Sequence, residues 1–261
     1  MRCTYCNHPI MKDFSEMTLE KGKELIDFIS EFGETKLLIT GGEPTTNEKF
    51  FELSKYAIKK ISFVSLCTNG TLTDEKEIRK IANLGFSNIT ISADGHEEKT
   101  NDLTRGNGSF VRLVNFARIL KEENANFSIH TVISKYNNDN IEEIINYWKE
   151  YTPNIEVSNQ LKKTIKNQPI DKESNIKKTN AKLITNKHIT LVGTEKGCDY
   201  DVCPINKYLF EINPKGEFVD CFWKNTCAIT PTSFEKLKQI KKIENLRKEL
   251  KKFVRDTDEN K

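Results

Sequence analysis

The chain has 261 residues, of which 30% are charged and 36% hydrophobic, and its net charge is +3. This composition is that of one large folded domain, or of a medium domain with a small one, and it excludes an intrinsically disordered chain. No apolar run reaches the roughly 18 residues of a membrane span, and no secretory leader opens the chain. These two features predict a cytoplasmic protein that binds no membrane. The balance of 41 basic against 38 acidic residues predicts that it binds no nucleic acid.

Helix-like and strand-like patterns alternate from residue 17 to about residue 160. Helices are expected at 19–32, 48–59, 74–84, 110–123 and 141–150, the last one capped by Asn140. Strands are expected at 36–40, 61–67, 88–92, 127–134 and 155–157. This alternation favours an α/β fold with a parallel sheet, either open or closed into a barrel. In both forms the chemistry lies on loops at the carboxyl ends of the strands.

The chain changes character after these strands. Residues 159–197 are rich in Lys, Asn and Thr and weakly periodic, and we interpret them as a connecting segment. Residues 208–212 and 217–220 are expected to form a hairpin, and 233–254 to form one or two docking helices. The expected organisation is a core over 1–160, a connecting segment over 161–197 and a small domain over 198–261.

Seven cysteines are the most informative residues of the sequence. Clustered cysteines in a cytoplasmic chain more often bind metal or do redox chemistry than form disulfides. They form two groups with one outlier: Cys3 and Cys6, then Cys67, then Cys198, Cys203, Cys221 and Cys227. The C-x-x-C pair of the first group by itself suits zinc, an iron–sulfur cluster or a redox dithiol. Cys67 ends an expected strand and is interpreted as a packing residue.

Short loops rich in glycine follow three of the expected strands, at residues 41–44 (GGEP), 69–70 (NG) and 92–95 (SADG). Together with the C-T-Y-C segment they resemble the radical S-adenosylmethionine (SAM) superfamily. Cys3, Tyr5 and Cys6 match the end of that family's C-x-x-x-C-x-aromatic-C motif, whose three cysteines hold a [4Fe–4S] cluster. The resemblance implies a loop that binds the amino group of SAM, made of Gly41, Gly42 and Glu43.

The segment 92–110 reads S-A-D-G and then N-D-x-x-R-G-x-G-S-F. It resembles the members of the superfamily that carry a SPASM or twitch extension. By this resemblance Ser92 contacts the ribose of SAM, and Arg105 its carboxylate, which the fork of a guanidinium suits. Asp94 and Asn69 are expected at the same pocket.

The late cysteines support the same subgroup. Cys203, Gly216 and Cys221 match the start of the extension, C-x(9–15)-G-x(4)-C, and only one cysteine follows them. This favours the shorter twitch form with one auxiliary [4Fe–4S] cluster. The expected ligands are Cys198, Cys203, Cys221 and Cys227, and an all-thiolate zinc site is the alternative.

The resemblance implies a fold and an activity. The fold is a partial (βα)6 barrel of the TIM type, whose first strand and first cluster cysteine are expected before Met1, followed by a small cysteine-bearing domain. The activity is reductive cleavage of SAM and hydrogen abstraction from a substrate, for which we expect a ribosomal peptide. A flavodoxin or ferredoxin is the expected electron donor. Two alternatives stay open: a small-molecule substrate (nucleotide, sugar or cofactor precursor), and a non-catalytic paralogue that acts as a binding module because one cluster ligand is missing.

Overall fold

The computed structural model describes the following residues: 3–4, 16–71, 74–159, 189–192, 211–212, 217–219, 232–233, 237, 239–241 and 245. The chain divides into two compact units, the first over 1–11, 36–58 and 63–193, and the second over 12–35, 59–62 and 194–261. Among the described residues, no helix is long and apolar enough to cross a membrane.

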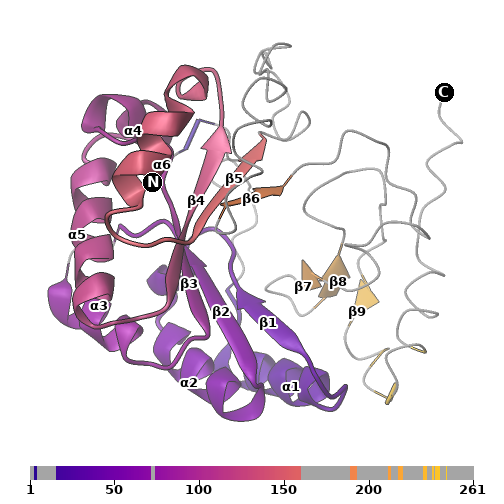
Figure 1. Cartoon of the computed structure of the whole chain (residues 1–261). Coiled ribbons are helices and arrows are strands. Elements are labelled where there is room, and N and C mark those ends of the chain that lie inside the picture. Colours follow the sequence, from indigo (N-terminus) through magenta and orange to yellow (C-terminus); the bar gives the residue numbers. More distant parts are fainter. Residues whose placement is uncertain are drawn as a thin grey trace, which may run out of the picture. The chain divides into compact units, whose positions relative to one another are not determined.

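The first unit is built on a six-stranded parallel sheet (Figure 1). Its strands follow one another across the sheet in sequence order: β1 (Lys36–Ile39), β2 (Phe63–Thr68), β3 (Asn88–Ser92), β4 (Phe127–Ile133), β5 (Ile155–Asn159) and β6 (Ile189–Val192). All neighbouring pairs are parallel. The carboxyl ends of the strands therefore share one edge of the sheet, as in a barrel of the TIM type.

Helices fill the connections between strands β1 and β5. They are α2 (Phe50–Lys60), α3 (Glu75–Ala82), α4 (Glu98–Arg105), α5 (Ser109–Glu122) and α6 (Ile141–Trp148), with single 3₁₀ turns η2 (Pro44–Thr46) and η3 (Asn138–Asn140). Asp74 caps α3, because its carboxylate accepts the Lys76 N–H at 2.8 Å. The expected cap of α6 is wrong: Asn140 precedes the helix, but its side chain makes no capping hydrogen bond.

Two elements were not expected from the sequence. Helix α4 lies in a stretch interpreted only as a motif, because it has no apolar stripe. Strand β6 lies inside the expected connecting segment and pairs in parallel with β5. The boundaries expected for the three regions of the chain stay predictions.

The two faces of the sheet differ in chemistry because side chains alternate along each strand. One face is apolar and buried, with Leu66, Ile91 and Ile129 each fully inaccessible to solvent. It packs under helices whose buried side chains include Phe116 and Trp148. Figure 1 shows α3, α5 and α6 along this side of the sheet. The other face is polar and carries the following side chains: Ser65, Cys67, Asn88, Thr90, Ser92, Ser128, His130, Glu156 and Ser158.

The second unit contains α1 (Leu19–Ser30) and a three-stranded antiparallel sheet of β7 (Glu211–Ile212), β8 (Glu217–Val219) and β9 (Thr232–Ser233). Thr18 caps α1 by accepting the Lys21 N–H. The predicted hairpin pairs β7 with β8, Ile212 opposite Phe218. Leu237, from the stretch expected to form docking helices, is buried against Leu25 and Phe28 of α1.

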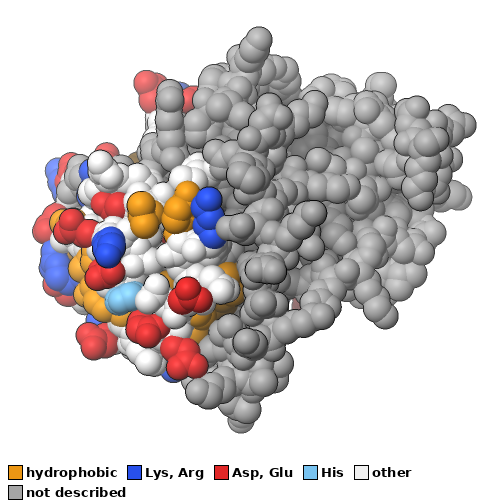
Figure 2. All heavy atoms as spheres, turned by 90° about the horizontal axis from the view of Figure 1, so that it is seen from above, with side chains coloured by type: hydrophobic (Ala, Val, Ile, Leu, Met, Phe, Trp, Pro, Cys, Tyr) orange, Lys and Arg blue, Asp and Glu red, His pale blue; other side chains and the backbone are white. Residues whose placement is uncertain are grey.

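Acidic and basic side chains are interspersed over the described part of the face seen from above (Figure 2). Between α3 and α5, Arg79 pairs with Glu122 (2.9 Å) and Glu123, while Arg118 pairs with Glu75 at 2.9 Å. These side chains are 24–54% exposed, so water and salt screen the pairs and they contribute little to stability. The pattern is that of a solvated helix surface.

Candidate SAM-binding site

The loop after β1 places the Glu43 carboxylate at the carboxyl-end edge of the sheet. Its oxygen Oε1 accepts the Thr45 hydroxyl (2.6 Å), the Thr45 N–H (3.3 Å) and the Thr68 hydroxyl (2.7 Å), and Oε2 accepts the Asn69 N–H at 2.7 Å. These bonds join the loop to the end of β2. All four donors are neutral, so they orient the carboxylate without cancelling its charge.

Each carboxylate oxygen has about two lone-pair sites, so Oε2 keeps room for a further donor. No lysine or arginine of the described residues forms an ion pair with Glu43. Gly41 and Gly42 beside it are exposed, and Gly41 has a φ of 146°, a conformation that favours glycine. The loop therefore suits a ligand ammonium, which needs a carboxylate and closely approaching backbone.

Asn69 enters this site through its backbone. Its side-chain oxygen accepts the Thr71 N–H at 2.9 Å and the Thr71 hydroxyl, which closes a turn after β2. Gly70 completes the turn with a φ of 64°, and a Cβ there would meet the Leu113 side chain at 2.9 Å. The side chain of Asn69 thus stabilises the turn, while its backbone N–H binds Glu43.

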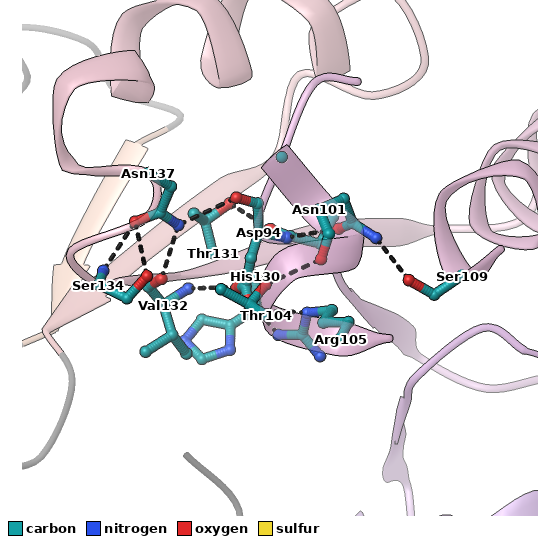
Figure 3. A network of polar contacts seen from close by, with 12 residues as sticks. Asp94, Asn101, Thr104, Arg105, Ser109, His130, Thr131, Val132, Ser134 and Asn137 are labelled. Carbon is teal, nitrogen blue, oxygen red and sulfur yellow. Dashed lines mark hydrogen bonds and ion pairs between the residues drawn. The ribbon is translucent and has the colours of Figure 1, made fainter. Parts of the chain in front are cut away.

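Asp94 and Arg105 form a buried ion pair with each other (Figure 3). Nε of Arg105 lies 2.8 Å from Oδ2 of Asp94, and Nη2 lies 3.0 Å from Oδ1. The two side chains are 6% and 0% exposed. Asp94 also accepts the Val132 N–H at 2.9 Å, so the pair joins α4 to the ends of β3 and β4. Because the guanidinium fork already holds one carboxylate, its contact with the SAM carboxylate stays a prediction.

The loop after β3 is held by four side chains, from α4, β4, α6 and the turn before η3, as Figure 3 shows for most of them. Asn101 accepts the Asp94 N–H at 3.0 Å, Asn137 donates to the Asp94 carbonyl at 3.0 Å, and Thr131 donates to the Ala93 carbonyl at 2.7 Å. The Trp148 indole donates to the Gly95 carbonyl at 2.9 Å. These bonds fix the loop in one conformation and satisfy its buried backbone groups.

The N-D-x-x-R-G-x-G-S-F motif proves to be a helix-to-helix connection. Asp102 accepts the Ser109 hydroxyl at 2.7 Å, the Phe110 N–H at 2.9 Å and the Gly108 N–H, and so caps α5. Burial on its own raises the pKa of Asp102, but these hydrogen bonds outweigh it, and the pKa lies below the ordinary value. Asn101 also donates to the Ser109 hydroxyl at 2.9 Å. The motif residues therefore stabilise the connection between α4 and α5, which lies next to the site.

Cys67 does not lie in the apolar core. It projects from the polar face of β2, where its thiol contacts Thr40 and Ser92. The charges of Arg105 and Glu43 lie close enough to affect its pKa. Burial raises the pKa of its thiol above the ordinary value, and the hydrogen bond with Ser92 only partly offsets this. Cys67 is thus a buried, neutral thiol beside the candidate site, on the polar face of the sheet and not in the apolar core.

The described residues bring together Gly41, Gly42, Glu43, Asn69, Ser92, Asp94 and Arg105 at the carboxyl-end edge. Cys3 joins them, because the Thr4 N–H donates to the Thr104 carbonyl at 2.9 Å, next to Arg105. Its thiol is half-buried and forms no disulfide. The other expected cofactor and metal residues lie outside the described residues: Tyr5, Cys6, Cys198, Cys203, Cys221 and Cys227. Within the described part, no group of three His, Cys, Asp or Glu side chains forms a metal site.

A parallel sheet with its polar loops at one edge is typical of α/β proteins that bind their ligand at the carboxyl ends of the strands. The sequence profile of the Radical SAM superfamily matches residues 1–147, more than half of the chain. The chain belongs to the Radical SAM superfamily, as the resemblance predicted.

Similar proteins cover the same region. The chain is 30% identical over 153 residues to the AdoMet-dependent heme synthase of Methanosarcina barkeri, covering 58% of this chain and 44% of that protein. It is 34% identical over 154 residues to the Fe-coproporphyrin III synthase of the same organism, covering 58% and 38%. It is 31% identical over 147 residues to the mycofactocin maturase MftC of Mycolicibacterium smegmatis, covering 55% and 37%. The chain thus spans less than half the length of these relatives.

Solved structures share the fold. Native anSMEcpe with bound AdoMet has a TM-score of 0.70 at 18% identity, covering 97% of this chain and 78% of that chain. SuiB of Streptococcus suis, bound to S-adenosylmethionine, has a TM-score of 0.69 at 16% identity, covering 98% and 63%. The predicted α/β class and its likeness to a partial TIM-type barrel are confirmed.

Proposed function

We propose that this chain is the catalytic core of a radical SAM enzyme that modifies a ribosomal peptide in the cytoplasm. The observation that carries the proposal is the Glu43 carboxylate, which four neutral donors orient while its charge stays uncompensated by the described residues. A site of this kind gains most from a ligand ammonium. SAM carries one, and its ribose would lie along the same edge at Ser92.

The [4Fe–4S] cluster and SAM would supply one-electron chemistry that removes a hydrogen atom from the substrate. Cys3 and Cys6 would supply two of the three cysteine ligands of this core cluster. Glu43 and the Gly41–Gly42 backbone would hold the amino group of SAM, and Ser92 its ribose. The Asp94–Arg105 pair would keep the β3 loop in place, and closure of the site around these residues would exclude water.

An auxiliary [4Fe–4S] cluster on Cys198, Cys203, Cys221 and Cys227 belongs to the same proposal, with structural zinc as its alternative. Four thiolates suit either metal centre. A flavodoxin or ferredoxin would deliver the electron. Cytoplasmic location fits the thiolate ligands, because free thiols persist in that reducing compartment.

The similar proteins include relatives that support a peptide substrate and relatives that support a small-molecule substrate. PqqA peptide cyclase of Bradyrhizobium diazoefficiens is 26% identical over 148 residues, and MftC is 31% identical over 147. A small-molecule substrate is the second candidate, because the two Methanosarcina synthases match at 30% and 34% identity. We favour the peptide, since both solved structures above share nearly the whole length of this chain and each has also been solved with a peptide.

The test is anaerobic reconstitution of the protein with iron and sulfide, followed by reduction in the presence of SAM. We expect bound iron and sulfide, broad visible absorbance and release of 5′-deoxyadenosine. Glu43→Gln should keep the iron content and bind SAM at least tenfold more weakly. The proposal would be refuted if the protein bound zinc in place of iron, or if the wild-type protein did not cleave SAM. Either result would favour the non-catalytic binding module.

A further inference from the structure

Three polar side chains form a row across the polar face of the sheet. Ser92 at the end of β3 is in register with His130 of β4, and His130 is in register with Glu156 of β5. Partners in register project to the same face, and parallel strands lie about 4.8 Å apart, which puts Glu156 about 10 Å from Ser92. A substrate that lies against SAM at Ser92 would extend along this row.

Glu156 is a half-buried carboxylate whose charge none of the described residues compensates. No hydrogen bond or ion pair links it to another side chain within the described part of the chain. Burial raises the pKa of Glu156 above its ordinary value. A carboxylate that loses water without gaining a donor costs free energy, so buried carboxylates are normally paired.

Among the residues that the structure describes, the basic side chains around this row do not supply that pairing. Arg105 is committed to Asp94 through two nitrogens. His130 places Nε2 at 2.8 Å from the Ser158 hydroxyl, which fixes the ring. Burial, and then the charge of Arg105, lower the pKa of His130, so the imidazole is neutral at pH 7. The row therefore presents one carboxylate beside two neutral hydrogen-bonding groups.

We propose that Glu156 is a substrate-binding residue that receives a cationic nitrogen group, the ammonium of a lysine or the guanidinium of an arginine. A carboxylate only accepts hydrogen bonds, and a half-buried one gains most from a charged donor. His130, held by Ser158, would bind a neutral polar group next to that cation. The inference rests on the proposed function, because it places the substrate beside SAM, and it narrows the substrate to a peptide with a basic side chain near the reacting position.

A half-buried carboxylate without a donor costs stability, and a residue that binds a ligand is where such a cost is expected. A purely structural glutamate would lose contacts on substitution, and the protein would become less stable. Glu156→Gln removes only the desolvated charge, so we expect its midpoint of urea unfolding at pH 7 to equal or exceed that of the wild-type protein. This readout separates the binding role from a structural one.

The binding test uses two capped tripeptides of matched length, acetyl-Gly-Lys-Gly-amide and acetyl-Gly-norleucine-Gly-amide. The chain contains four histidines, so the imidazole signals of His130 can be assigned by nuclear magnetic resonance and followed in a titration. We expect the lysine peptide to shift them saturably and the norleucine peptide to leave them unchanged. Glu156→Gln should weaken binding of the lysine peptide at least tenfold, while Glu143→Gln, an exposed glutamate of α6, should not change it.

Two results would overturn the inference: equal shifts with both peptides, or unchanged binding of the lysine peptide to Glu156→Gln. Neither result depends on iron, on SAM or on turnover. Failure of the proposed function shows instead as absence of SAM cleavage by the wild-type protein, so the two failures are read from different experiments.

Discussion

The buried pair of Asp94 and Arg105 gives the sharpest test of how this site is held. Arg105→Met leaves the Asp94 carboxylate fully buried and removes both of its ion-pair contacts, at 2.8 and 3.0 Å. Breaking one partner of a buried pair costs about 3–5 kcal/mol, because a charge is left desolvated. Against a typical total of about 5–15 kcal/mol, this loss removes a large share of the free energy of unfolding.

The assay is urea unfolding followed by circular dichroism, on Arg105→Met, Asp94→Asn and the double variant. Each single change leaves one buried charge without its partner, whereas the double change removes both charges. We therefore expect each single variant to lose about 3–5 kcal/mol and the double variant to lose about 2 kcal/mol less than their sum. The matched control is Arg112→Met, since Arg112 of the neighbouring helix α5 has no ion pair with a described residue.

The reasoning is refuted if Arg105→Met costs less than about 1 kcal/mol, the value of an exposed pair, or if the two single effects add. Such a result would mean that the guanidinium is not committed to Asp94. It would then favour the role that the family resemblance assigns to Arg105, contact with the SAM carboxylate, and SAM affinity rather than stability would fall.

Three further predictions concern Gly95, Asp102 and Glu156. Gly95→Ala should destabilise the protein by more than about 2 kcal/mol or prevent folding, because a Cβ would lie 2.3 Å from the Asn101 backbone nitrogen; Gly42→Ala, with open space around it, is the control in the same unfolding assay. Asp102→Ala should cost about 1–2 kcal/mol in urea unfolding through loss of the α5 cap, and a change below 0.5 kcal/mol would contradict the capping role. Burial raises the pKa of Glu156, so the folded state binds the proton more tightly than the unfolded state. The free energy of unfolding of the wild-type protein, relative to that of Glu156→Gln, should therefore fall as the pH rises from about 4.5 through the raised pKa. Parallel pH profiles of the two proteins in urea unfolding would show that the carboxylate is solvated.

Local patterns in the sequence were enough to predict the parallel α/β class. Strand β3 was predicted with its observed bounds, Asn88–Ser92, and β4 within one residue of its observed end. Short apolar runs between amphipathic helices leave few other arrangements. The placement of the polar loops at one edge followed from the same pattern, because parallel strands all end on the same side.

Helix α4 shows where local patterns fail. Its sequence, EKTNDLTR, carries one large apolar side chain, Leu103, and that side chain is 53% exposed. The helix is held by polar contacts of its buried face, Thr100, Asn101, Thr104 and Arg105. Hydrophobic periodicity has no signal for such a helix, since its partners are the loop after β3 and the start of α5.

The sequence by itself determined the family, the order of strands β1 to β5 with the helices between them except α4, and the loop that carries Glu43. Only the tertiary structure decided which face of the sheet each strand residue joins, and with it the places of Cys67 and Glu156. Alternation along a strand separates two sets of side chains, but it does not say which set the helices cover. The pairing of Asp94 with Arg105 was decided in the same way, because the turn of α4, and not the spacing of eleven residues, brings the guanidinium to the carboxylate.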